Sequence, residues 1–211
     1  MAISLVLMMG NSHLRRRKMK VLVACEFSGR VRDSFVERGH DAVSCDLLPS
    51  EGDPLNSHYQ GDVSDILGDG WDLMIAFPPC THLTVSGARW FPDKREEQRE
   101  ALDFVRLLME APIDRICIEN PVGLISTHIR KPDQIFNPYQ FGHGELKRTC
   151  LWLKNLPMLR STNVVRGREQ KSWLMWPSPD RAKTRSLTYS GVAEAMASQW
   201  GVPSPVQLEL L

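Results

Sequence analysis

Apolar residues along this chain form short runs, separated by turns and by longer stretches in which apolar positions recur with helical spacing. The short runs predict strands at residues 20–24, 42–45, 73–76, 115–118 and 149–153. Helical spacing predicts helices at residues 31–38, 94–110 and 192–199. Strands that alternate with helices in this way indicate an α/β fold, with a parallel or mostly parallel sheet and helices on both of its faces.

Composition narrows the class of protein. Of the 211 residues, 42% are hydrophobic and 24% are charged, which fits one globular domain able to bury about 70% of its unfolded surface. The five cysteines lie far apart in the sequence, so no CxxC pair is present to clip a zinc ion, and their odd number argues against a secreted disulfide framework. We therefore expect a protein that binds no metal and is located in the cytoplasm. If the protein is virally encoded, the expected location is the cytoplasm of the host.

The first 19 residues differ from the rest of the chain. An apolar stretch at residues 3–9 precedes a basic cluster at residues 15–18. This order is the reverse of that in a signal peptide, and the stretch is too short for a membrane span. We expect residues 1–19 to be a flexible basic extension, with a nucleic-acid-binding arm as the alternative, and residues 20–211 to form a single domain. No membrane partner is expected, and the sequence leaves the oligomeric state open.

Charge is segregated along the chain, although the formal net charge is only +1. Residues 21–130 carry 10 basic and 19 acidic side chains, whereas residues 147–185 carry ten basic and two acidic ones, with Trp152, Trp173 and Trp176 interleaved. Basic side chains neutralise phosphates and indoles stack on bases, so this segment indicates a nucleic-acid footprint; a merely solvated basic face is the alternative. The candidate nucleic-acid-binding residues are Lys147, Arg166, Arg168, Lys171, Arg181, Lys183 and Arg185.

Candidate chemistry follows two of the predicted strands. Phe77-Pro78-Pro79-Cys80 comes directly after the strand at 73–76, and Glu119-Asn120-Pro121 directly after the strand at 115–118. Because the carboxyl ends of parallel strands meet at one edge of a sheet, a thiol and a carboxylate are expected to share a site there. Nucleophilic attack on a pyrimidine ring needs this pair of groups.

A second set of residues follows the first two strands. The strand at 20–24 runs into Cys25-Glu26-Phe27-Ser28-Gly29, where the glycine permits a close turn at a helix start, and the strand at 42–45 ends at Asp46. A carboxylate at that position can accept hydrogen bonds from ribose hydroxyls. Asp62, further along, is placed to lie near an adenine amino group. Together these residues predict an adenosine-bearing cofactor.

The motifs occur in the order of those of DNA (cytosine-5) methyltransferases, and the chain resembles a compact member of that family. The resemblance spans residues 20–201 and rests on Phe27-Ser28-Gly29, Asp46, Pro78-Pro79-Cys80, Glu119-Asn120-Pro121, Lys147-Arg148-Thr149 and Tyr189-Ser190-Gly191. It implies a Rossmann-like methyltransferase fold, S-adenosylmethionine as methyl donor and double- or single-stranded DNA as partner. The implied donor contacts are Cys25, Glu26, Phe27, Ser28, Gly29, Asp46, Asp62, Phe77 and Pro78.

The resemblance also implies roles at the reacting base. Cys80 matches the nucleophile that attacks carbon 6 of cytosine, so that carbon 5 gains the electron density to accept a methyl group. Glu119 matches the carboxyl group that holds the ring nitrogen and the exocyclic amine, and Arg148 matches the arginine that steadies the base and the nucleophile. A free thiol is largely protonated at neutral pH, so the site must favour the anion or supply a base.

The chain departs from the family pattern at several points. Arg30-Val31-Arg32 follows Gly29, where the family has further glycines, which predicts a bulkier and more basic donor loop. The family's Glu-Asn-Val is Glu-Asn-Pro here, and its Gln-x-Arg-x-Arg motif is represented at most by Lys147-Arg148-Thr149. Members with stringent specificity have a large target-recognition domain where residues 154–180 stand. We therefore expect a small basic recognition insert with modest sequence readout.

Three functions remain open on the sequence. The favoured one is S-adenosylmethionine-dependent methylation of carbon 5 of cytosine in DNA. The second has the same chemistry on a free cytosine nucleotide or RNA, because the recognition segment is so small. The third is a catalytically silent nucleic-acid-binding protein, against which the presence of Cys80 and Glu119 argues. Two histidines are secondary candidates: His82 for proton relay and His143, in a glycine-flanked loop, for contact with the substrate.

Overall fold

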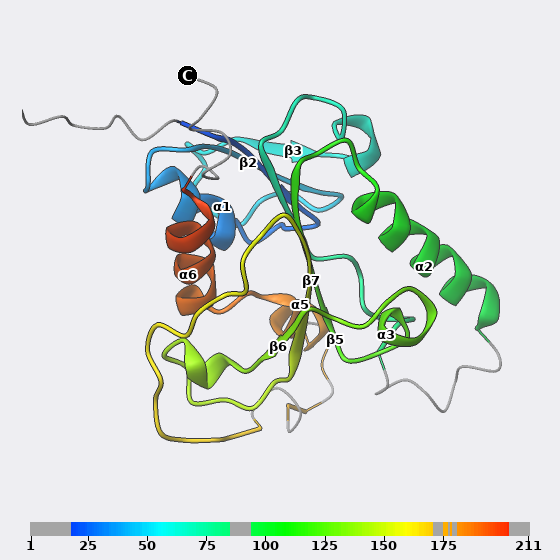
Figure 1. Ribbon diagram of the computed structural model, residues 1–211, viewed down its shortest axis with the longest axis vertical. Coiled ribbons are helices and arrows are strands. Elements are labelled where there is room, and N and C mark those ends of the chain that lie inside the picture. Colours follow the sequence, from blue (N-terminus) through cyan, green and yellow to red (C-terminus); the bar gives the residue numbers. More distant parts are fainter. Residues whose placement is uncertain (1–17, 85–93, 171–174, 177, 179–180, 203–211) are drawn as a thin grey trace, which may run out of the picture.

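A seven-stranded sheet forms the centre of the molecule (Figure 1). The computed structural model describes residues 18–84, 94–170, 175–176, 178 and 181–202. In spatial order the strands are β3 (His58–Gln60), β2 (Asp41–Asp46), β1 (Lys20–Ala24), β4 (Leu73–Ala76), β5 (Arg115–Pro121), β7 (Thr149–Lys154) and β6 (Gln134–Phe136). The strands from β3 to β5 pair in parallel, and β7 is antiparallel to both β5 and β6.

The strand order reverses between β1 and β4. From β1 the chain moves outward to β2 and β3, and it then returns to place β4 and β5 on the other side of β1. Loops that leave neighbouring strands in opposite directions open a crevice outside the carboxyl ends of the strands, where ligands bind in sheets of this kind. The residues that follow β1, β2, β4 and β5 are therefore expected to line the ligand site.

Helices cover both faces of the sheet, which confirms the expected Rossmann-like class. α1 (Arg30–Val36) and α6 (Ser190–Trp200) pack together on one face, and α2 (Arg95–Met109) lies on the other (Figure 1). Shorter helical segments complete the described chain: η1 (Val63–Asp65), α3 (Ile125–His128), η3 (Pro138–Gln140) and α5 (Arg181–Ser186).

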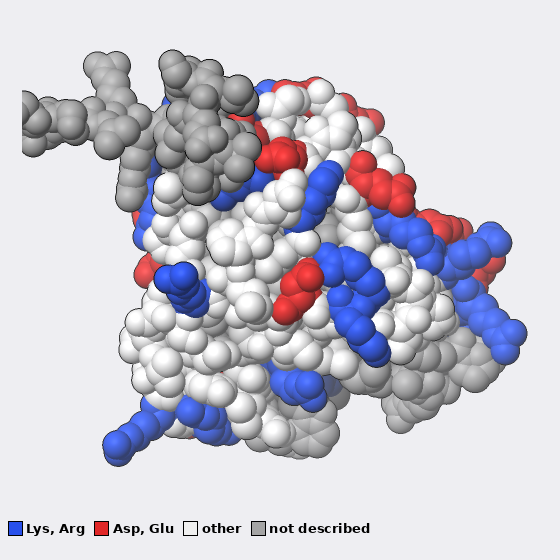
Figure 2. Space-filling model, in the orientation of Figure 1, with Lys and Arg blue, Asp and Glu red and all other residues white. Residues whose placement is uncertain are grey.

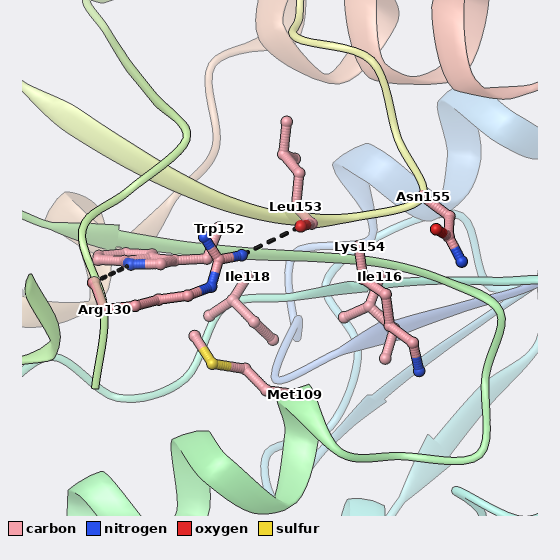
Figure 3. A pocket seen from close by; sticks show the side chains of 8 residues that line it. All are labelled: Met109, Ile116, Ile118, Arg130, Trp152, Leu153, Lys154 and Asn155. Atoms are coloured by element: carbon pink, nitrogen blue, oxygen red, sulfur yellow. Dashed lines mark hydrogen bonds between the residues drawn. The ribbon is translucent and has the colours of Figure 1, made fainter.

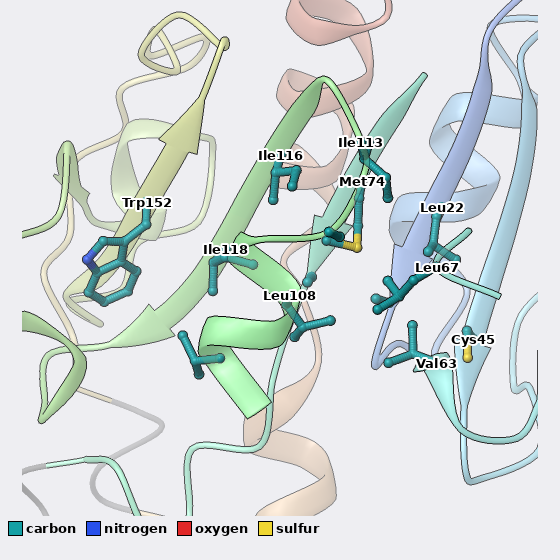
Figure 4. Packing of buried hydrophobic residues seen from close by; sticks show 14 of the residues in the cluster. Leu22, Cys45, Val63, Leu67, Met74, Leu108, Ile113, Ile116, Ile118 and Trp152 are labelled. Carbon is teal, nitrogen blue, oxygen red and sulfur yellow. The ribbon is translucent and has the colours of Figure 1, made fainter. Parts of the chain in front are cut away.

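Alternation along the strands divides the core into two layers. In β1, Leu22 and Ala24 face the α2 side, whereas Val21 and Val23 face α1 and α6. Figure 4 shows the α2-side layer, in which side chains from β1, β4, β5 and β7 meet α2. Because both faces are covered, the central strands read as continuous apolar runs, the pattern that revealed them in the sequence.

All the strands and helices predicted from the sequence are present, with ends shifted by a few residues at most. The strand predicted at 149–153 is antiparallel, however, so its first residue rather than its last lies at the carboxyl edge of the parallel strands. Trp152, on that strand, was a candidate for base stacking, and the structure contradicts this role. Its side chain is 1% exposed and its indole N–H donates to the Arg130 carbonyl at 2.8 Å, because strand alternation turns it into the core.

Met19 belongs to the folded domain, although the sequence placed it at the end of the extension. It is buried against the core on the α1 side, and the Asp41 N–H donates to its carbonyl at 2.8 Å. Residues 1–17 lie outside the described residues. Among the helices of the described part of the chain, none has the length and apolar character needed to cross a membrane.

Candidate active site at the carboxyl edge of the sheet

The loops that follow β4 and β5 are locked to each other. The Asn120 side-chain amide donates to the Pro78 carbonyl at 2.8 Å, and the Leu124 N–H donates to the Leu83 carbonyl at 2.8 Å. Gly123 allows the second contact, because a Cβ atom there would lie 2.0 Å from the Leu83 carbonyl oxygen. The two motifs recognised in the sequence are thus held as one unit, although no sequence pattern pointed to Gly123.

Cys80 and Glu119 are close enough in this unit for their charges to act on each other. Burial is the main cause that raises the pKa of the half-buried Cys80 thiol, and the Glu119 carboxylate raises it further. The positive charges of Lys147 and Arg185 act in the opposite direction. Burial also raises the pKa of Glu119, and Lys147 opposes this shift. A carboxyl group whose pKa is raised and a thiol under cationic influence therefore belong to one electrostatic cluster.

Lys147, rather than Arg148, is the cation that the strand β7 brings to these two groups. Thr149 and Leu151 share a face of the sheet with Cys117 and Glu119, and the charge of Lys147, two residues before the strand, acts on both Cys80 and Glu119. The Lys147 ammonium donates to the Arg185 carbonyl at 2.8 Å. Arg148 is exposed, and its charge acts instead on the thiol of Cys150, which belongs to the opposite core layer.

The turn after β1 closes the start of α1 with a carboxylate. Glu26 is 4% exposed and accepts hydrogen bonds from the N–H groups of Val31 at 2.7 Å and Arg32 at 3.2 Å. Burial raises the pKa of Glu26 to about 7, against these hydrogen bonds, which lower it. Because Glu26 occupies the free N–H groups at this helix start, the position that holds a pyrophosphate in dinucleotide-binding folds is already filled.

Three acidic or thiol groups gather at the ends of β1, β2 and β3. Cys25, which adopts a left-handed backbone conformation at φ 58°, has a pKa raised to about 12, mainly by burial and then by the charges of Asp46 and Asp62. Asp46 is half-buried and uses Oδ1 to accept the Leu48 N–H at 2.9 Å. Asp62 is exposed and caps η1 through Ser64, whose hydrogen bonds lower its pKa. The structure thus brings the expected donor residues of β1 to β3 together.

Phe27 and Phe77 complete this side of the edge, and Leu47 adds a feature that sequence reasoning missed. Phe27 is buried and Phe77 is half-buried against the core, so each offers only part of its ring. Leu47 follows Asp46 directly and is 73% exposed. An exposed leucine beside the carboxylate expected to bind ribose would offer an apolar surface to an adenine ring; its place directly after the β2 aspartate was the signal available in the sequence.

Arg32 does not make the donor loop more basic, contrary to the expectation from Arg30-Val31-Arg32. Its guanidinium is fully buried and binds Asp33 at 2.7 Å, the Ser44 hydroxyl at 3.1 Å and the Asp53 carbonyl at 3.2 Å. These contacts fasten the loop between β2 and β3 onto α1. The positive charge of Arg32 is therefore paired inside the protein and is not available to a ligand.

Residues 160–170, which we call the basic strip, are fixed to the segment before Lys147. Backbone hydrogen bonds connect the two segments: Gly142 N–H to Asn163 O, Val165 N–H to Tyr139 O, Leu146 N–H to Glu169 O and Glu169 N–H to Gly144 O, between 2.7 and 3.1 Å. Arg160, Arg166 and Arg168 are exposed on the strip, and the Arg168 guanidinium lies 3.5 Å from the centre of the Tyr139 ring. The described part of the expected insert is thus held by the backbone against the segment before Lys147.

The remaining candidates fall into three groups. Arg181, Lys183 and Arg185 lie on α5, and Lys183 forms an ion pair with Glu51. Trp176 is 84% exposed, whereas Lys171 and Trp173 lie outside the described residues. His143 accepts the Gly191 N–H at 3.1 Å and so holds the start of α6. The Nδ1 atom of His82 is buried and has no hydrogen-bond partner in the part of the chain that the structure describes.

A groove of about 400 Å³ elsewhere on the molecule does not offer comparable chemistry (Figure 3). It lies over the β5–β7 side of the α2 layer, where Ile116, Ile118 and Trp152 form the floor. Its polar side chains are engaged: Arg130 binds the Leu153 carbonyl at 3.0 Å, and Lys154 binds the Ile113 carbonyl at 2.8 Å. Among the described residues, no group of three or more His, Cys, Asp or Glu side chains is arranged to hold a metal ion.

Comparison with known proteins yields structural similarity at low sequence identity. No family model and no curated protein matches the chain. Similar solved structures include S. pombe Dnmt2 methyltransferase (15% identity, 67% of this chain and 51% of that one, TM-score 0.45) and a mutant of Spodoptera frugiperda DNMT2 (15%, 72% and 55%, 0.44). A third is Burkholderia thailandensis 1,6-didemethyltoxoflavin-N1-methyltransferase with bound 1,6-didemethyltoxoflavin and S-adenosylhomocysteine (19%, 66% and 56%, 0.30). The chain spans about half the length of these proteins, so their activities do not transfer with the likeness.

Proposed function

We propose that this protein transfers a methyl group from S-adenosylmethionine to carbon 5 of cytosine in DNA through a covalent intermediate on Cys80. The observation that carries the proposal is the locked pair of loops after β4 and β5. It holds a thiol and a carboxyl group of raised pKa together at the carboxyl edge of the sheet, within reach of the charge of Lys147. Binding a nucleic acid requires no such nucleophile.

Cys80 begins the reaction by adding its sulfur to carbon 6 of the ring. The electron pair of the carbon 5–carbon 6 double bond then moves onto carbon 5 and toward the ring nitrogen. Glu119, whose pKa is raised by burial, donates a proton to that nitrogen and stabilises the charge that develops there. Carbon 5 uses its electron pair to bond the methyl carbon that S-adenosylmethionine would supply when bound, and the electrons of the methyl–sulfur bond stay on the departing S-adenosylhomocysteine. The proton on carbon 5 then passes to water, which restores the carbon 5–carbon 6 double bond as the Cys80 thiolate leaves with the electron pair of the sulfur–carbon bond. Glu119 takes back its proton from the ring nitrogen.

Lys147 has two effects on this sequence. Its charge favours the thiolate of Cys80 before attack, and it stabilises negative charge near the base after attack. Its ammonium is fixed by the Arg185 carbonyl and lies 5.7 Å from the centre of the Tyr189 ring. Lys147 therefore occupies the role that the family resemblance gives to an arginine.

The residues at the ends of β1 to β3 fit the proposed donor. S-adenosylmethionine carries an adenosine but no phosphate, and Glu26 already fills the phosphate-binding start of α1. The Oδ2 atom of Asp46 accepts no hydrogen bond from the described residues and is free to accept one from a ribose hydroxyl. Leu47 supplies an apolar surface for the adenine, and the Phe27 turn lies toward the amino-acid end of the donor.

DNA is the proposed polymer because backbone hydrogen bonds attach the basic strip to the segment directly before Lys147. Phosphates of a strand whose cytosine reaches Cys80 would lie along Arg166 and Arg168, and the base would be extruded from its stack or taken from a single strand. The shortness of the strip favours a second candidate, the same chemistry on a free cytosine nucleotide or RNA. The affinity for a free nucleotide would not be increased by basic side chains that lie beyond the reach of its own phosphates.

A covalent trap tests the mechanism. DNA with 5-fluorocytosine should become attached to the protein in the presence of S-adenosylmethionine and survive denaturation, because fluorine does not leave carbon 5 as a proton does. Cys80→Ser should abolish both the adduct and methylation of ordinary DNA and leave donor binding, measured by calorimetry, intact. Methylation by Cys80→Ser at the wild-type rate would rule out the proposed mechanism. The same assay with RNA and with cytosine nucleotides identifies the substrate class.

A further inference from the structure

The helix α5 touches the donor side of the site through one residue. The Lys183 ammonium forms an ion pair with Glu51 and lies 5.4 Å from the centre of the Phe27 ring. Glu51 is itself tied to the same turn, because its N–H donates to the Phe27 carbonyl at 2.8 Å. Lys183 therefore clasps the turn that we assign to the amino-acid end of the donor.

Two residues further on, the same helix touches the thiol side. The Arg185 carbonyl accepts the Lys147 ammonium at 2.8 Å, and the charge of Arg185 acts on the Cys80 thiol. The last turn of α5 is closed by the Ser186 hydroxyl, which donates to the Lys183 carbonyl at 2.7 Å. Lys183 and Arg185 are thus two residues apart on one short helix, so a movement of the whole helix would displace both.

The chain after α5 is also anchored at the donor side. The Arg30 guanidinium, in the first residue of α1, donates to the Thr188 carbonyl at 2.8 Å. The segment from Lys183 to Thr188 therefore spans from the Phe27 turn to Lys147 and back to α1. The positions of Lys147 and Arg185 near Cys80 therefore depend on the contacts that hold residues 183–188 in place.

We propose that α5 couples the two halves of the site, with Lys183 as the positioning residue through which donor binding at the Phe27 turn increases the reactivity of Cys80. The inference rests on the proposed function, in which Cys80 is the nucleophile. A donor against Phe27 seats the turn and Lys183, and α5 then holds Arg185 and Lys147 close to the sulfur. Because the attraction between a cation and a thiolate falls with distance, seating α5 favours the reactive anion. The protein thereby activates its thiol when the methyl donor is present.

The test measures the thiol separately from catalysis. S-adenosylhomocysteine, which carries no methyl group to transfer, is added at saturation, and the rate of Cys80 alkylation by iodoacetamide is followed by mass spectrometry across a range of pH. In the wild type the pH profile should move to lower pH, with a several-fold faster reaction near neutral pH. The profile distinguishes activation from steric shielding, which slows the reaction at every pH without moving the profile.

Matched variants assign the effect to Lys183. Lys183→Met and Glu51→Gln should each remove most of the shift, Lys183→Arg should restore it, and Lys131→Met, which removes an exposed lysine outside the site, should leave it in place. If S-adenosylhomocysteine binds and the Cys80 profile does not move, or moves equally in Lys183→Met, the coupling is refuted and the proposed function stands. If S-adenosylhomocysteine does not bind the wild type, the proposed function and the coupling both fail.

Discussion

At the scale of single residues, the site depends on a balance of charges at one sulfur. Burial and Glu119 hold the proton on Cys80, and Lys147 and Arg185 favour its release. Burial also raises the pKa of Glu119, so Glu119 opposes the thiolate less whenever it carries its proton. The four side chains come from four separate segments, and each is expected to shift the reactivity of Cys80 in a defined direction.

Glu119→Gln should affect the thiol and catalysis in opposite directions. Without the carboxylate, the pKa of Cys80 falls, so alkylation by iodoacetamide between about pH 7 and pH 9 becomes faster. Methylation should nevertheless fall by about 100-fold, because the positioned acid at the ring nitrogen is lost. Alkylation slower than in the wild type would show that Glu119 assists the thiolate instead of opposing it.

Lys147→Met and Arg148→Met form a matched pair on neighbouring residues. The first should raise the pKa of Cys80 and slow alkylation at neutral pH by about tenfold, the effect of one pKa unit. Arg148→Met should leave the profile of Cys80 unchanged, because the charge of Arg148 acts on Cys150 across the sheet. Equal effects of the two variants would contradict the placement of Lys147.

The sequence identified Cys80 and Glu119 because each follows a buried strand whose apolar run is plain. It did not distinguish Lys147 from Arg148, because that choice depends on which face each residue takes just before an antiparallel strand. The loop lock through Asn120 and Gly123 also lay beyond the sequence, since both contacts join residues that are close only after the sheet has formed. Short-range patterns carry no information on such contacts.

At the scale of elements, the short segments around the site are too short to be stable alone, and side-chain hydrogen bonds hold them in place. α1 has seven residues, its early N–H groups donate to the Glu26 carboxylate, and the loop before β3 is fastened by Arg32. Isolated helices of this length are not stable in water. The sequence predicted α1 and α2 from apolar spacing, but β3, β6 and α5 are too short to show a period. These short elements nevertheless include α5, to which we assign the coupling role, and β3, which lies beside the residues expected to bind the methyl donor.

The cap on α1 predicts a dependence of stability on pH. Glu26 has an ordinary pKa of 4.5 and one of about 7 in the folded protein. Between these values the folded protein retains a proton that the unfolded chain has lost, so the contribution to stability is complete below about pH 4.5 and is lost as the pH rises through 7. Relative to Glu26→Gln, the free energy of unfolding of the wild type should fall by about 3 kcal/mol across this window.

Urea unfolding of both proteins at a series of pH values measures the difference. Glu37→Gln serves as the control, since Glu37 is exposed at the other end of α1 and its loss should leave the slope of the wild type in place. Parallel curves for the wild type and Glu26→Gln would mean that the Glu26 carboxyl group does not titrate in the window.

At the scale of the whole molecule, charge separates in space as it does in the sequence. On the face in Figure 2, acidic side chains lie mainly in the upper half, and the described surface of the lowest part shows basic ones. Residues 155–170, yellow in Figure 1, leave β7 near the middle of the molecule and run down into that lower region. The basic residues were visible in the sequence, but their backbone attachment to the segment before Lys147 was not, because it pairs irregular segments that carry no strand pattern.

The basic strip predicts a salt-dependent affinity for DNA. Arg166→Glu combined with Arg168→Glu should reduce the slope of log affinity against log salt by about two, one for each phosphate that an arginine no longer neutralises. Arg99→Glu combined with Arg106→Glu makes the same change in net charge on exposed residues of α2, on the other face of the sheet, and should have little effect on the slope. Binding by filter retention over a series of salt concentrations measures both. An equal change in the two double variants would assign the effect to net charge alone.

The basic strip is attached through main-chain groups, and this has a consequence for how the protein can change over generations. Hydrogen bonds from Gly142, Val165, Leu146 and Glu169 use backbone N–H and carbonyl groups, which every residue type except proline provides in full. The exposed side chains of the strip can therefore be exchanged while its register against the site is retained. If the proposed function holds, substrate preference and catalytic chemistry can evolve separately, and a library randomised at positions 160, 166 and 168 should alter the substrate while the residues around Cys80 stay the same.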